Sequence, residues 1–186
     1  MIQDYHEFLG DILVTESAIQ KRVVELGAQI SQDYAGQDLV LLCILRGGVP
    51  FLTDLMRQIT VPVMVDFMAV SSYGVGSRRS SGQPRIVLDV NTDIRGRNVL
   101  LVEDIIDSGH TLKAVVDFLG TRMPKKIGIC VLLDKAERRE VNVPVDYIGF
   151  AIPDKFVFGY GLDLDEYYRN LPFIGTVIAD KYHPSH

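Results

Sequence analysis

The sequence predicts an α/β protein in which a mostly parallel sheet is flanked by helices. Two observations favour this class. Short, continuous apolar runs recur through the middle of the chain, and such runs are typical of parallel strands that are buried on both faces. Segments in which apolar residues have helical spacing lie between these runs, and this alternation indicates a sheet with helices on both sides.

The two ends of the chain depart from this alternation. The aromatic-rich tail after about residue 152 has no regular rhythm of strand and helix. We expect it to join the first dozen residues in a small hood over the carboxyl edge of the sheet. The 186 residues then make one domain, with a core at about 15–152 and a hood at about 1–14 and 153–186.

The first helix is expected directly after Thr15, which is suited to be its N-cap, and Gly36 lies beyond its end. Further helices are expected over 49–59 and from Leu112 to Leu119. The buried face of the first helix is predicted by apolar residues spaced by four, three and four positions: Ile19, Val23, Leu26 and Ile30. The expected strands are 38–45, 61–70, 85–90, 98–102, 126–133 and 145–152.

The longest polar segment, residues 71–84, is too rich in serine and glycine for a core element. A linker between two domains is the alternative, but strand patterns resume directly after this segment. We therefore predict a mobile functional loop here, of the kind that closes over a site.

Composition and charge exclude several function classes. Apolar residues make up 47% of the chain and charged residues 23%, as in ordinary soluble globular proteins. The net charge of −5 argues against general binding of nucleic acid or membrane surfaces, which needs a basic face. Because no signal sequence and no apolar stretch of bilayer length is recognisable, we expect a cytoplasmic protein. Cys43 and Cys130 lie within apolar runs and are expected to be buried free thiols.

Acidic and small residues follow the apolar run 100–102 in an order that suggests a ligand site. Glu103 and Asp104 come first, then an apolar pair, then Asp107 and the turn Ser108-Gly109-His110-Thr111. Ligands of open α/β sheets bind beyond the carboxyl ends of the strands, and the free amides of a helix N-terminus bind phosphate. Carboxylate oxygens suit Mg²⁺ or ribose hydroxyls. The alternatives are a solvated acidic edge and a plain helix cap by Ser108.

This order of residues resembles the phosphoribosyl-pyrophosphate (PRPP) signature of the type I phosphoribosyltransferases. Further segments narrow the resemblance to the 6-oxopurine branch, the hypoxanthine and hypoxanthine-guanine phosphoribosyltransferases: Leu45-Arg46-Gly47-Gly48, Ser71-Ser72-Tyr73-Gly74, and Lys135 with residues 154–163. The resemblance implies the type I phosphoribosyltransferase fold and a role in purine salvage. The implied reaction is the Mg²⁺-dependent transfer of the phosphoribosyl group from PRPP to N9 of hypoxanthine, and also of guanine, with release of pyrophosphate.

The resemblance also implies roles for the acidic motif. Asp107 would act as the general base and accept the purine N7 proton, with organisation of the loop as the competing role. Glu103 and Asp104 would hold the ribose hydroxyls and a Mg²⁺ ion, and Asp163 would bind a second Mg²⁺ ion. The loop that Asp107 opens would bind the 5′-phosphate through Ser108, Gly109, His110 and Thr111. For His110 we expect the backbone amide to matter more than the imidazole.

Purine recognition would fall to residues further along the chain. Lys135 would donate to the purine O6 and so favour 6-oxopurines over 6-aminopurines, with an ordinary exposed lysine as the alternative. Phe156 would stack on the ring, although an aromatic residue in an apolar run is more often part of the core. Val157 and Asp163 would offer backbone groups to the edge of the base.

The segment Leu45-Arg46-Gly47-Gly48 would be the pyrophosphate loop, with its amides turned toward the ligand. The resemblance implies a non-proline cis peptide between Leu45 and Arg46. Arg169 would also reach pyrophosphate, with a surface ion pair as its alternative. Ser72 and Tyr73 would belong to a lid that excludes water from the reacting centre.

Two other functions remain open. One is a relative that prefers xanthine, whereas Lys135 disfavours an adenine-specific enzyme. The other is a regulator of this fold that binds nucleotide or RNA without turnover, and binding RNA would need a basic face. The compact arginine pairs are Arg78-Arg79 and Arg138-Arg139, in an acidic chain. Since the family usually forms dimers or tetramers, we expect a homodimer or homotetramer. Its small-molecule partners would be PRPP, hypoxanthine and guanine. We expect no nucleic-acid or membrane partner.

Overall fold

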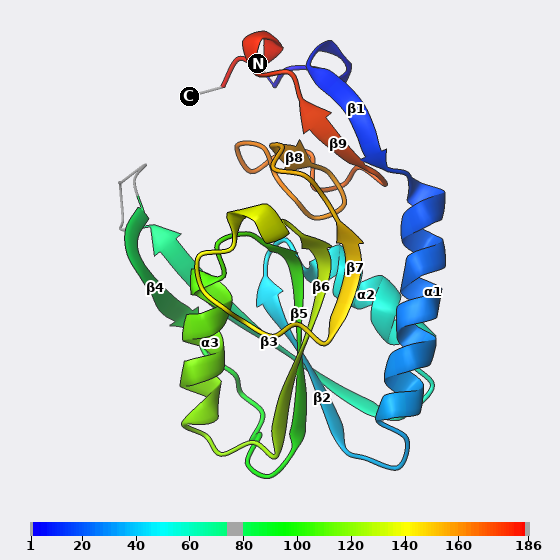
Figure 1. Ribbon diagram of the computed structural model, residues 1–186, viewed down its shortest axis with the longest axis vertical. Helices are drawn as coiled ribbons and strands as arrows, with labels where there is room; N and C mark the ends of the chain where they lie inside the picture. The colour runs from blue at the N-terminus through cyan, green and yellow to red at the C-terminus, as the bar shows by residue number, and fades with distance from the viewer. Residues whose placement is uncertain (1, 74–79, 185–186) are drawn as a thin grey trace.

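The computed structural model describes residues 2–73 and 80–184, with the backbone alone for residues 72–73 and 80–84. Within this part of the chain, six strands form the main sheet in the order β4-β3-β2-β5-β6-β7 (Figure 1). All neighbouring pairs are parallel except β3 and β4, so the mostly parallel sheet is confirmed. Its strands are β2 (Leu39–Leu45), β3 (Val63–Tyr73), β4 (Ser80–Leu88), β5 (Asn98–Ile106), β6 (Lys126–Asp134) and β7 (Tyr147–Ala151).

Helices cover both faces of this sheet (Figure 1). α1 (Glu16–Asp33) and α2 (Val49–Gln58) pack on one face, and α3 (His110–Gly120) packs on the other. The expected N-cap of α1 is confirmed, because Thr15 Oγ1 accepts a hydrogen bond from Ala18 N at 3.3 Å.

The strands alternate their side chains between two cores. Along β2, Leu41 lies in the core under α1 and α2, whereas Leu42 lies in the core under α3. Burial on both faces explains why the central strands are continuous apolar runs. Cys43 and Cys130 are free thiols in the first of these cores, as expected, and burial raises the pKa of both.

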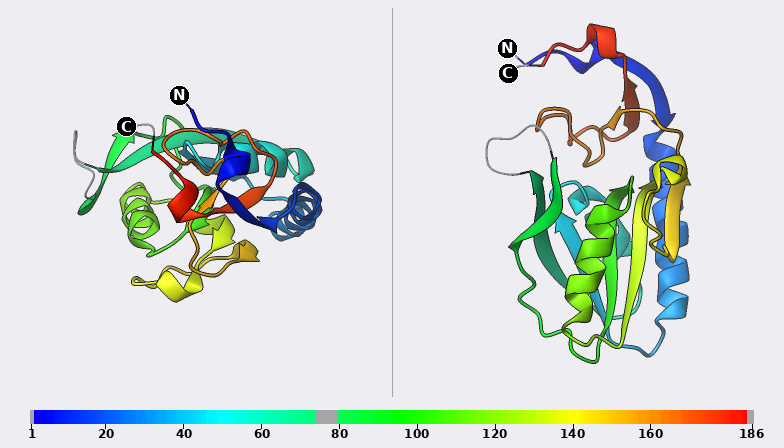
Figure 2. Two further views of the ribbon diagram at one scale, coloured as in Figure 1. Left: turned by 90° about the horizontal axis from the view of Figure 1, so that it is seen from above. Right: turned by 60° about the vertical axis from the view of Figure 1, so that its left-hand side comes forward.

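The two ends of the chain form a smaller sheet above the carboxyl edge of the first one (Figures 1 and 2). Its antiparallel strands lie in the order β1-β9-β8 (Figure 2). Beside it, Gln3 Nε2 donates to the carbonyl oxygen of Lys181 at 2.9 Å, which joins the segments before β1 and after β9. The expected hood is therefore confirmed. Its core is Phe8, Phe158, Leu164 and Leu171. The strands are β1 (Leu9–Val14), β8 (Val157–Phe158) and β9 (Ile174–Val177). The 3₁₀ helices among the described residues are η1 (Tyr5–Glu7), η2 (Ala136–Arg138) and η3 (Ala179–Lys181).

Some predicted boundaries at the carboxyl edge are wrong. β5 extends to Ile106, so Glu103 and Asp104 lie within the strand beside β6 and not after its end. α3 begins at His110 instead of Leu112. The acidic motif is consequently held by a strand ladder and by the start of a helix, which leaves a short loop between them.

The predicted loop 71–84 is partly a β-hairpin. β3 continues to Tyr73 and pairs there with Ser80 of β4, while residues 74–79 lie outside the described residues. Backbone hydrogen bonds between the two arms allow this serine-rich sequence to form strands. Among the helices that the structure describes, none combines the length and the apolar character that crossing a membrane requires.

Candidate active site

A cavity of about 230 Å³ lies at the carboxyl end of β5, between that strand and the start of α3. The two acids and most of the predicted phosphate loop line it together: Glu103, Asp104, Asp107, Ser108, Gly109 and Thr111. The imidazole of His110 is exposed and pairs instead with Glu140, whose Oε2 lies 2.9 Å from Nε2. Residues that are consecutive in the motif therefore surround one volume.

The start of α3 leaves its backbone amides available to this cavity. Gly109 is the N-cap, with a left-handed φ of 91°, and no side-chain hydrogen bond caps this described helix. The alternative of a plain cap by Ser108 is therefore wrong. A Cβ at Gly109 would also lie 2.8 Å from the carbonyl oxygen of Val141, so the position requires glycine on two grounds. Uncapped amides at a helix N-terminus suit an anion.

Glu103 and Asp104 form an acidic pair on the cavity wall, in which Asp104 is buried and Glu103 is half-buried. Asp104 is 9% exposed, and its Oδ1 accepts a hydrogen bond from Ile105 N at 2.7 Å. Oε2 of Glu103 is buried and has no hydrogen-bond partner among the described residues. Burial raises the pKa of both carboxyls, and the adjacent Asp104 raises that of Glu103 further. A solvated acidic edge is therefore excluded.

The donor set of this pair fits Mg²⁺. A buried carboxylate oxygen without a partner is an atom that a cation satisfies, and Mg²⁺ prefers oxygen ligands. Within the described residues, no three acidic, histidine or cysteine side chains form one cluster, so Asp163 does not complete a cage with Glu103 and Asp104. Since Mg²⁺ usually keeps waters and takes one or two carboxylates plus substrate phosphates, a two-acid site is sufficient.

We expect Glu103→Gln to raise the melting temperature of the ligand-free protein at neutral pH. The raised pKa means that the folded state binds the proton more tightly than the unfolded chain, so ionising this carboxyl costs stability. The cost sets in as pH rises above the ordinary carboxyl pKa and is complete above the raised one. Each kcal/mol of relief would shift the melting temperature by about 2–4 °C, measured by thermal unfolding.

The control for this variant is Glu25→Gln, which neutralises an exposed carboxylate on α1. The gain from Glu103→Gln should disappear in acid, where Glu103 is protonated in both states. An equal gain in the control, or a gain that persists in acid, would contradict the assigned burial cost.

The predicted pyrophosphate loop packs directly against the acidic pair. The peptide bond between Leu45 and Arg46 is cis, as expected. A Cβ at Gly47 would lie 1.6 Å from Asp104 Oδ2. Gly161, with a φ of 99°, approaches this loop from the hood side. A Cβ added at Gly161 would lie 2.0 Å from the carbonyl oxygen of Gly47. The loop, the acids of β5 and the segment after β8 therefore meet at one point.

Arg46 and Arg169 share one carboxylate. Glu166 Oε2 lies 2.6 Å from a guanidinium nitrogen of Arg46 and 3.3 Å from one of Arg169. Arg169 also pairs with Asp163 at 2.9 Å and donates to the carbonyl oxygen of Gly161 at 2.8 Å. Glu166 was not predicted, and its one signal in the sequence was its spacing of three residues from both Asp163 and Arg169.

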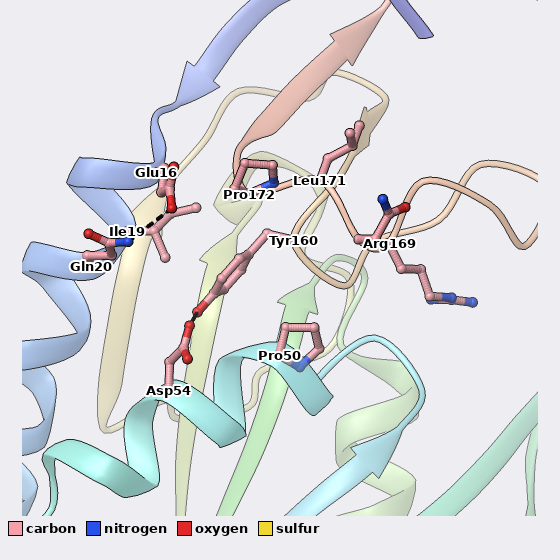
Figure 3. Close-up of a pocket in the computed structure, with 10 residues that line it drawn as sticks. Glu16, Ile19, Gln20, Pro50, Asp54, Tyr160, Arg169, Leu171 and Pro172 are labelled. Atoms are coloured by element: carbon pink, nitrogen blue, oxygen red, sulfur yellow. Dashed lines mark hydrogen bonds between the residues drawn. The ribbon is translucent and has the colours of Figure 1, made fainter. Parts of the chain in front are cut away.

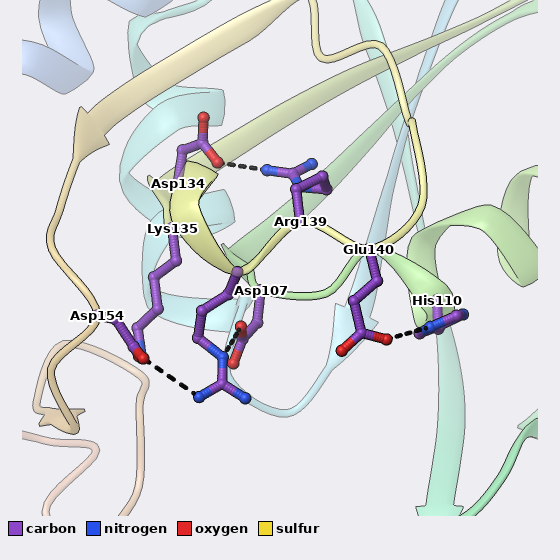
Figure 4. A network of polar contacts seen from close by, with 8 residues as sticks. Asp107, His110, Asp134, Lys135, Arg139, Glu140 and Asp154 are labelled. Carbon is purple, nitrogen blue, oxygen red and sulfur yellow. Dashed lines mark hydrogen bonds and ion pairs between the residues drawn. The ribbon is translucent and has the colours of Figure 1, made fainter.

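Lys135, Asp107 and Asp154 belong to one network of charges (Figure 4). Lys135 is only 7% exposed, so it is not an ordinary exposed lysine, and its Nζ lies 3.7 Å from Asp154 Oδ1. Arg138 of η2 contacts both acids: its Nε lies 2.8 Å from Asp107 Oδ1, and its Nη1 lies 3.4 Å from Asp154 Oδ2. The sequence indicated Arg138 only as part of a possible basic face for RNA.

The remaining predicted residues lie at the hood and at the end of β3. Phe156 is 64% exposed, so the alternative of a core residue is wrong and its ring is free to stack. Val157 is buried in β8, where it pairs with Thr176 of β9. Ser72 and Tyr73 end β3, but their side chains lie outside the described residues, so the lid stays a prediction.

A separate cavity of about 280 Å³ lies between the hood, α1 and α2 (Figure 3). The hydroxyl of Tyr160 donates to Asp54 Oδ2 at 2.6 Å on its wall. Arg169 lines this cavity, but its guanidinium turns away from Tyr160 (Figure 3). Because the acids of β5 do not line this cavity, we assign the chemistry to the cavity at the end of β5.

Comparisons with known proteins show the family to which the chain belongs. Residues 11–166 match the family described as "Phosphoribosyl transferase domain". The hypoxanthine phosphoribosyltransferase of Escherichia coli (strain K12) is 51% identical over 170 residues, which cover 90% of this chain and 95% of that protein. The hypoxanthine phosphoribosyltransferase of Salmonella typhimurium is 49% identical over 170 residues, with the same coverage of 90% and 95%.

The fold agrees as well. A crystal structure of a hypoxanthine phosphoribosyltransferase from Staphylococcus aureus has a TM-score of 0.91 at 42% identity and covers 99% of this chain and 100% of that one. A hypoxanthine-guanine phosphoribosyltransferase from Bacillus anthracis has a TM-score of 0.84 at 42% identity, covering 91% of this chain and 98% of that one. The expected type I phosphoribosyltransferase fold is thus confirmed, and the chain belongs to the family of the hypoxanthine phosphoribosyltransferases.

Proposed function

We propose that the chain transfers the 5-phosphoribosyl group of PRPP to N9 of hypoxanthine in purine salvage, giving IMP and pyrophosphate. Guanine is a second substrate and gives GMP. The observation that carries this proposal is the cavity at the end of β5, which the acidic pair and the uncapped start of α3 line together, with Gly47 packed against Asp104. Such a cavity offers donors to a phosphate and acceptors to sugar hydroxyls side by side.

PRPP binds with its 5′-phosphate at the start of α3. The amides of the first turn and the hydroxyls of Ser108 and Thr111 donate to the phosphate oxygens. Glu103 and Asp104 accept hydrogen bonds from the ribose hydroxyls. The burial of Asp104 and the buried, unpartnered Oε2 of Glu103 are consistent with this role, because a buried acceptor without a partner gains most from a bound ligand.

The pyrophosphate group binds between the Arg46-Gly47 loop and Arg169. Both arginines now pair with Glu166, so pyrophosphate takes the place of this carboxylate. Glu103 and Asp104 would hold one Mg²⁺ ion and Asp163 a second. Such ions would supply positive charge that neutralises the pyrophosphate as it leaves.

Lys135 and Asp107 manage the base. Lys135 Nζ donates to the purine O6, Phe156 stacks on the ring, and the backbone of Val157 and Asp163 meets the edge of the base. As N9 bonds to C1, the bond from C1 to pyrophosphate breaks, with inversion at C1. The N7 proton passes to Asp107, and its bonding electron pair stays on the purine ring.

A turnover assay tests the proposed function. The protein is incubated with PRPP, hypoxanthine and Mg²⁺, and IMP and pyrophosphate are expected in equal amounts. Values of kcat/KM for hypoxanthine, guanine and xanthine then distinguish this enzyme from a relative that prefers xanthine. Binding of PRPP without formation of any nucleotide would favour the non-catalytic regulator.

We expect Lys135→Gln to weaken discrimination against adenine. The ammonium faces the adenine amino group donor to donor, a strong penalty in a desolvated site, and glutamine can present its carbonyl oxygen instead. Losing the charged donor to O6 should lower kcat/KM for hypoxanthine by about 10- to 100-fold. Steady-state kinetics with both bases measures the ratio.

Lys125→Gln is the matched control, because Lys125 is exposed just before β6. It should leave both values of kcat/KM unchanged. Discrimination at the original level in Lys135→Gln would mean that another group reads position 6 of the base.

We further propose that the protein works in the cytoplasm as a homodimer or homotetramer, without nucleic acid or membrane partners. Its acidic net charge of −5 supports the absence of those partners.

The chain acts as one phosphoribosyltransferase domain, with a core at about 15–152 and a hood at about 1–14 and 153–186. Ser72 and Tyr73 belong to its lid. Light scattering coupled to size-exclusion chromatography tests the oligomeric state.

A further inference from the structure

We propose that Arg138 is a positioning residue for the proton transfer. Its guanidinium holds the Asp107 carboxylate at the edge of the purine site, and Asp154 anchors the guanidinium from the other side. This inference rests on the proposed function, and it assigns a role to a residue outside the motifs that identify the family.

The contacts of Arg138 form a bridge across the site. Its Nε lies 2.8 Å from Asp107 Oδ1, and its Nη1 lies 3.4 Å from Asp154 Oδ2. Asp154 Oδ1 in turn lies 3.7 Å from Lys135 Nζ. Positive and negative groups therefore alternate from Lys135 to Asp107 (Figure 4). The bridge links the residue proposed to read O6 with the residue proposed to take the N7 proton.

The backbone that carries Arg138 is fixed to both parts of the site. Arg138 N donates to the carbonyl oxygen of Lys135 at 3.0 Å, and Lys135 N donates to the carbonyl oxygen of Ile106 at 3.0 Å. Just beyond η2, Glu140 N donates to the carbonyl oxygen of Ser108 at 3.0 Å. The guanidinium thus extends from a segment tied to β5 and to the phosphate loop, as a positioning group requires.

The neighbouring Arg139 shows what a purely structural arginine does at this turn. It forms an ion pair with Asp134 in which both side chains are largely buried, 19% and 13% exposed. Arg138 is 49% exposed and Asp107 is 44% exposed. Because exposed ion pairs add little to folding stability, the contacts of Arg138 are better explained by the site than by the fold.

The geometry leaves one carboxylate oxygen of Asp107 for the base. Oδ1 of Asp107 is buried and faces Nε of Arg138 in an ion pair, so Oδ2 is the oxygen left to accept the N7 proton. A half-exposed aspartate without such a partner samples several rotamers, and each one that turns away from N7 is unproductive. The guanidinium remains protonated throughout, so Arg138 orients Asp107 without exchanging a proton itself.

The test is Arg138→Gln, measured with PRPP and hypoxanthine varied separately. We expect kcat to fall by about 10-fold, since misplacing a catalytic group by a fraction of an ångström has effects of this order. KM for PRPP should stay the same, because Arg138 does not line the phosphate cavity. In an Asp107→Asn background, Arg138→Gln should cause no further loss, because there is no base left to position.

Arg95→Gln is the matched control, an exposed arginine in the turn before β5 that should leave kcat unchanged. Melting temperatures show that each variant is folded. An unchanged kcat in Arg138→Gln, or an equal loss in the wild-type and Asp107→Asn backgrounds, would overturn this proposal and leave the proposed function intact. An unmodified protein that forms no nucleotide would overturn both.

Discussion

Asp107→Asn should lower kcat by about 10²- to 10⁴-fold, the range that a general base contributes, while KM for PRPP stays nearly unchanged. The amide keeps the size of the side chain and one acceptor oxygen, but it cannot take a proton. Asp107 lines the cavity at the end of β5 beside the start of α3, so binding of the sugar phosphate can survive the loss of the base. Steady-state kinetics with PRPP and hypoxanthine varied in turn measures both quantities.

Asp117→Asn is the control, because Asp117 is an exposed carboxylate on α3 that pairs with Lys113. It should leave kcat and both KM values unchanged. If Asp107→Asn raises KM for PRPP without lowering kcat, Asp107 organises the phosphate loop instead of moving the proton. An unchanged kcat would mean that a group other than Asp107 accepts the proton.

Local signals account for most of the fold that was predictable. The apolar run of β2 is buried on both faces, and the four-three-four spacing after Thr15 is the buried face of α1. The wrongly predicted strand boundaries lie where pairing with a neighbouring strand determines the end of the strand. β5 continues through Glu103 and Asp104 because β6 continues beside it, and β3 and β4 form a hairpin from a serine-rich sequence.

The site was predictable as far as it consists of consecutive residues. The motif at 103–111 was recognisable because one strand, one loop and one helix start place its residues, except His110, around a single cavity. Glu166 and Arg138 were not, because their contacts join segments far apart in the chain. The distance of 2.6 Å between Arg46 and Glu166 exists only once the hood has folded over the sheet. The exposure of Phe156 also depends on the fold, so the apolar residues around it in the sequence could not predict it.

Gly47→Ala should raise KM for PRPP by about 100-fold, since a shift of the order of 1 Å in a binding group can have an effect of that size. The new Cβ would lie 1.6 Å from Asp104 Oδ2 and 2.7 Å from its Cγ, so the carboxylate must leave its place. Asp104 is buried and held by the amide of Ile105, so it cannot move aside without losing that hydrogen bond. The proposed ribose and Mg²⁺ ligand is then displaced while the backbone of the loop can remain.

Gly120→Ala provides the matched control for this variant. Gly120 lies at the end of α3, where an added Cβ meets nothing within 4 Å, so the same methyl group should be harmless or slightly stabilising there. Circular dichroism and the melting temperature separate a displaced carboxylate from a failure to fold. A folded Gly47→Ala protein with the original KM for PRPP would mean that the Asp104 carboxylate does not hold the sugar, because the close packing of Gly47 would then have no bearing on substrate binding.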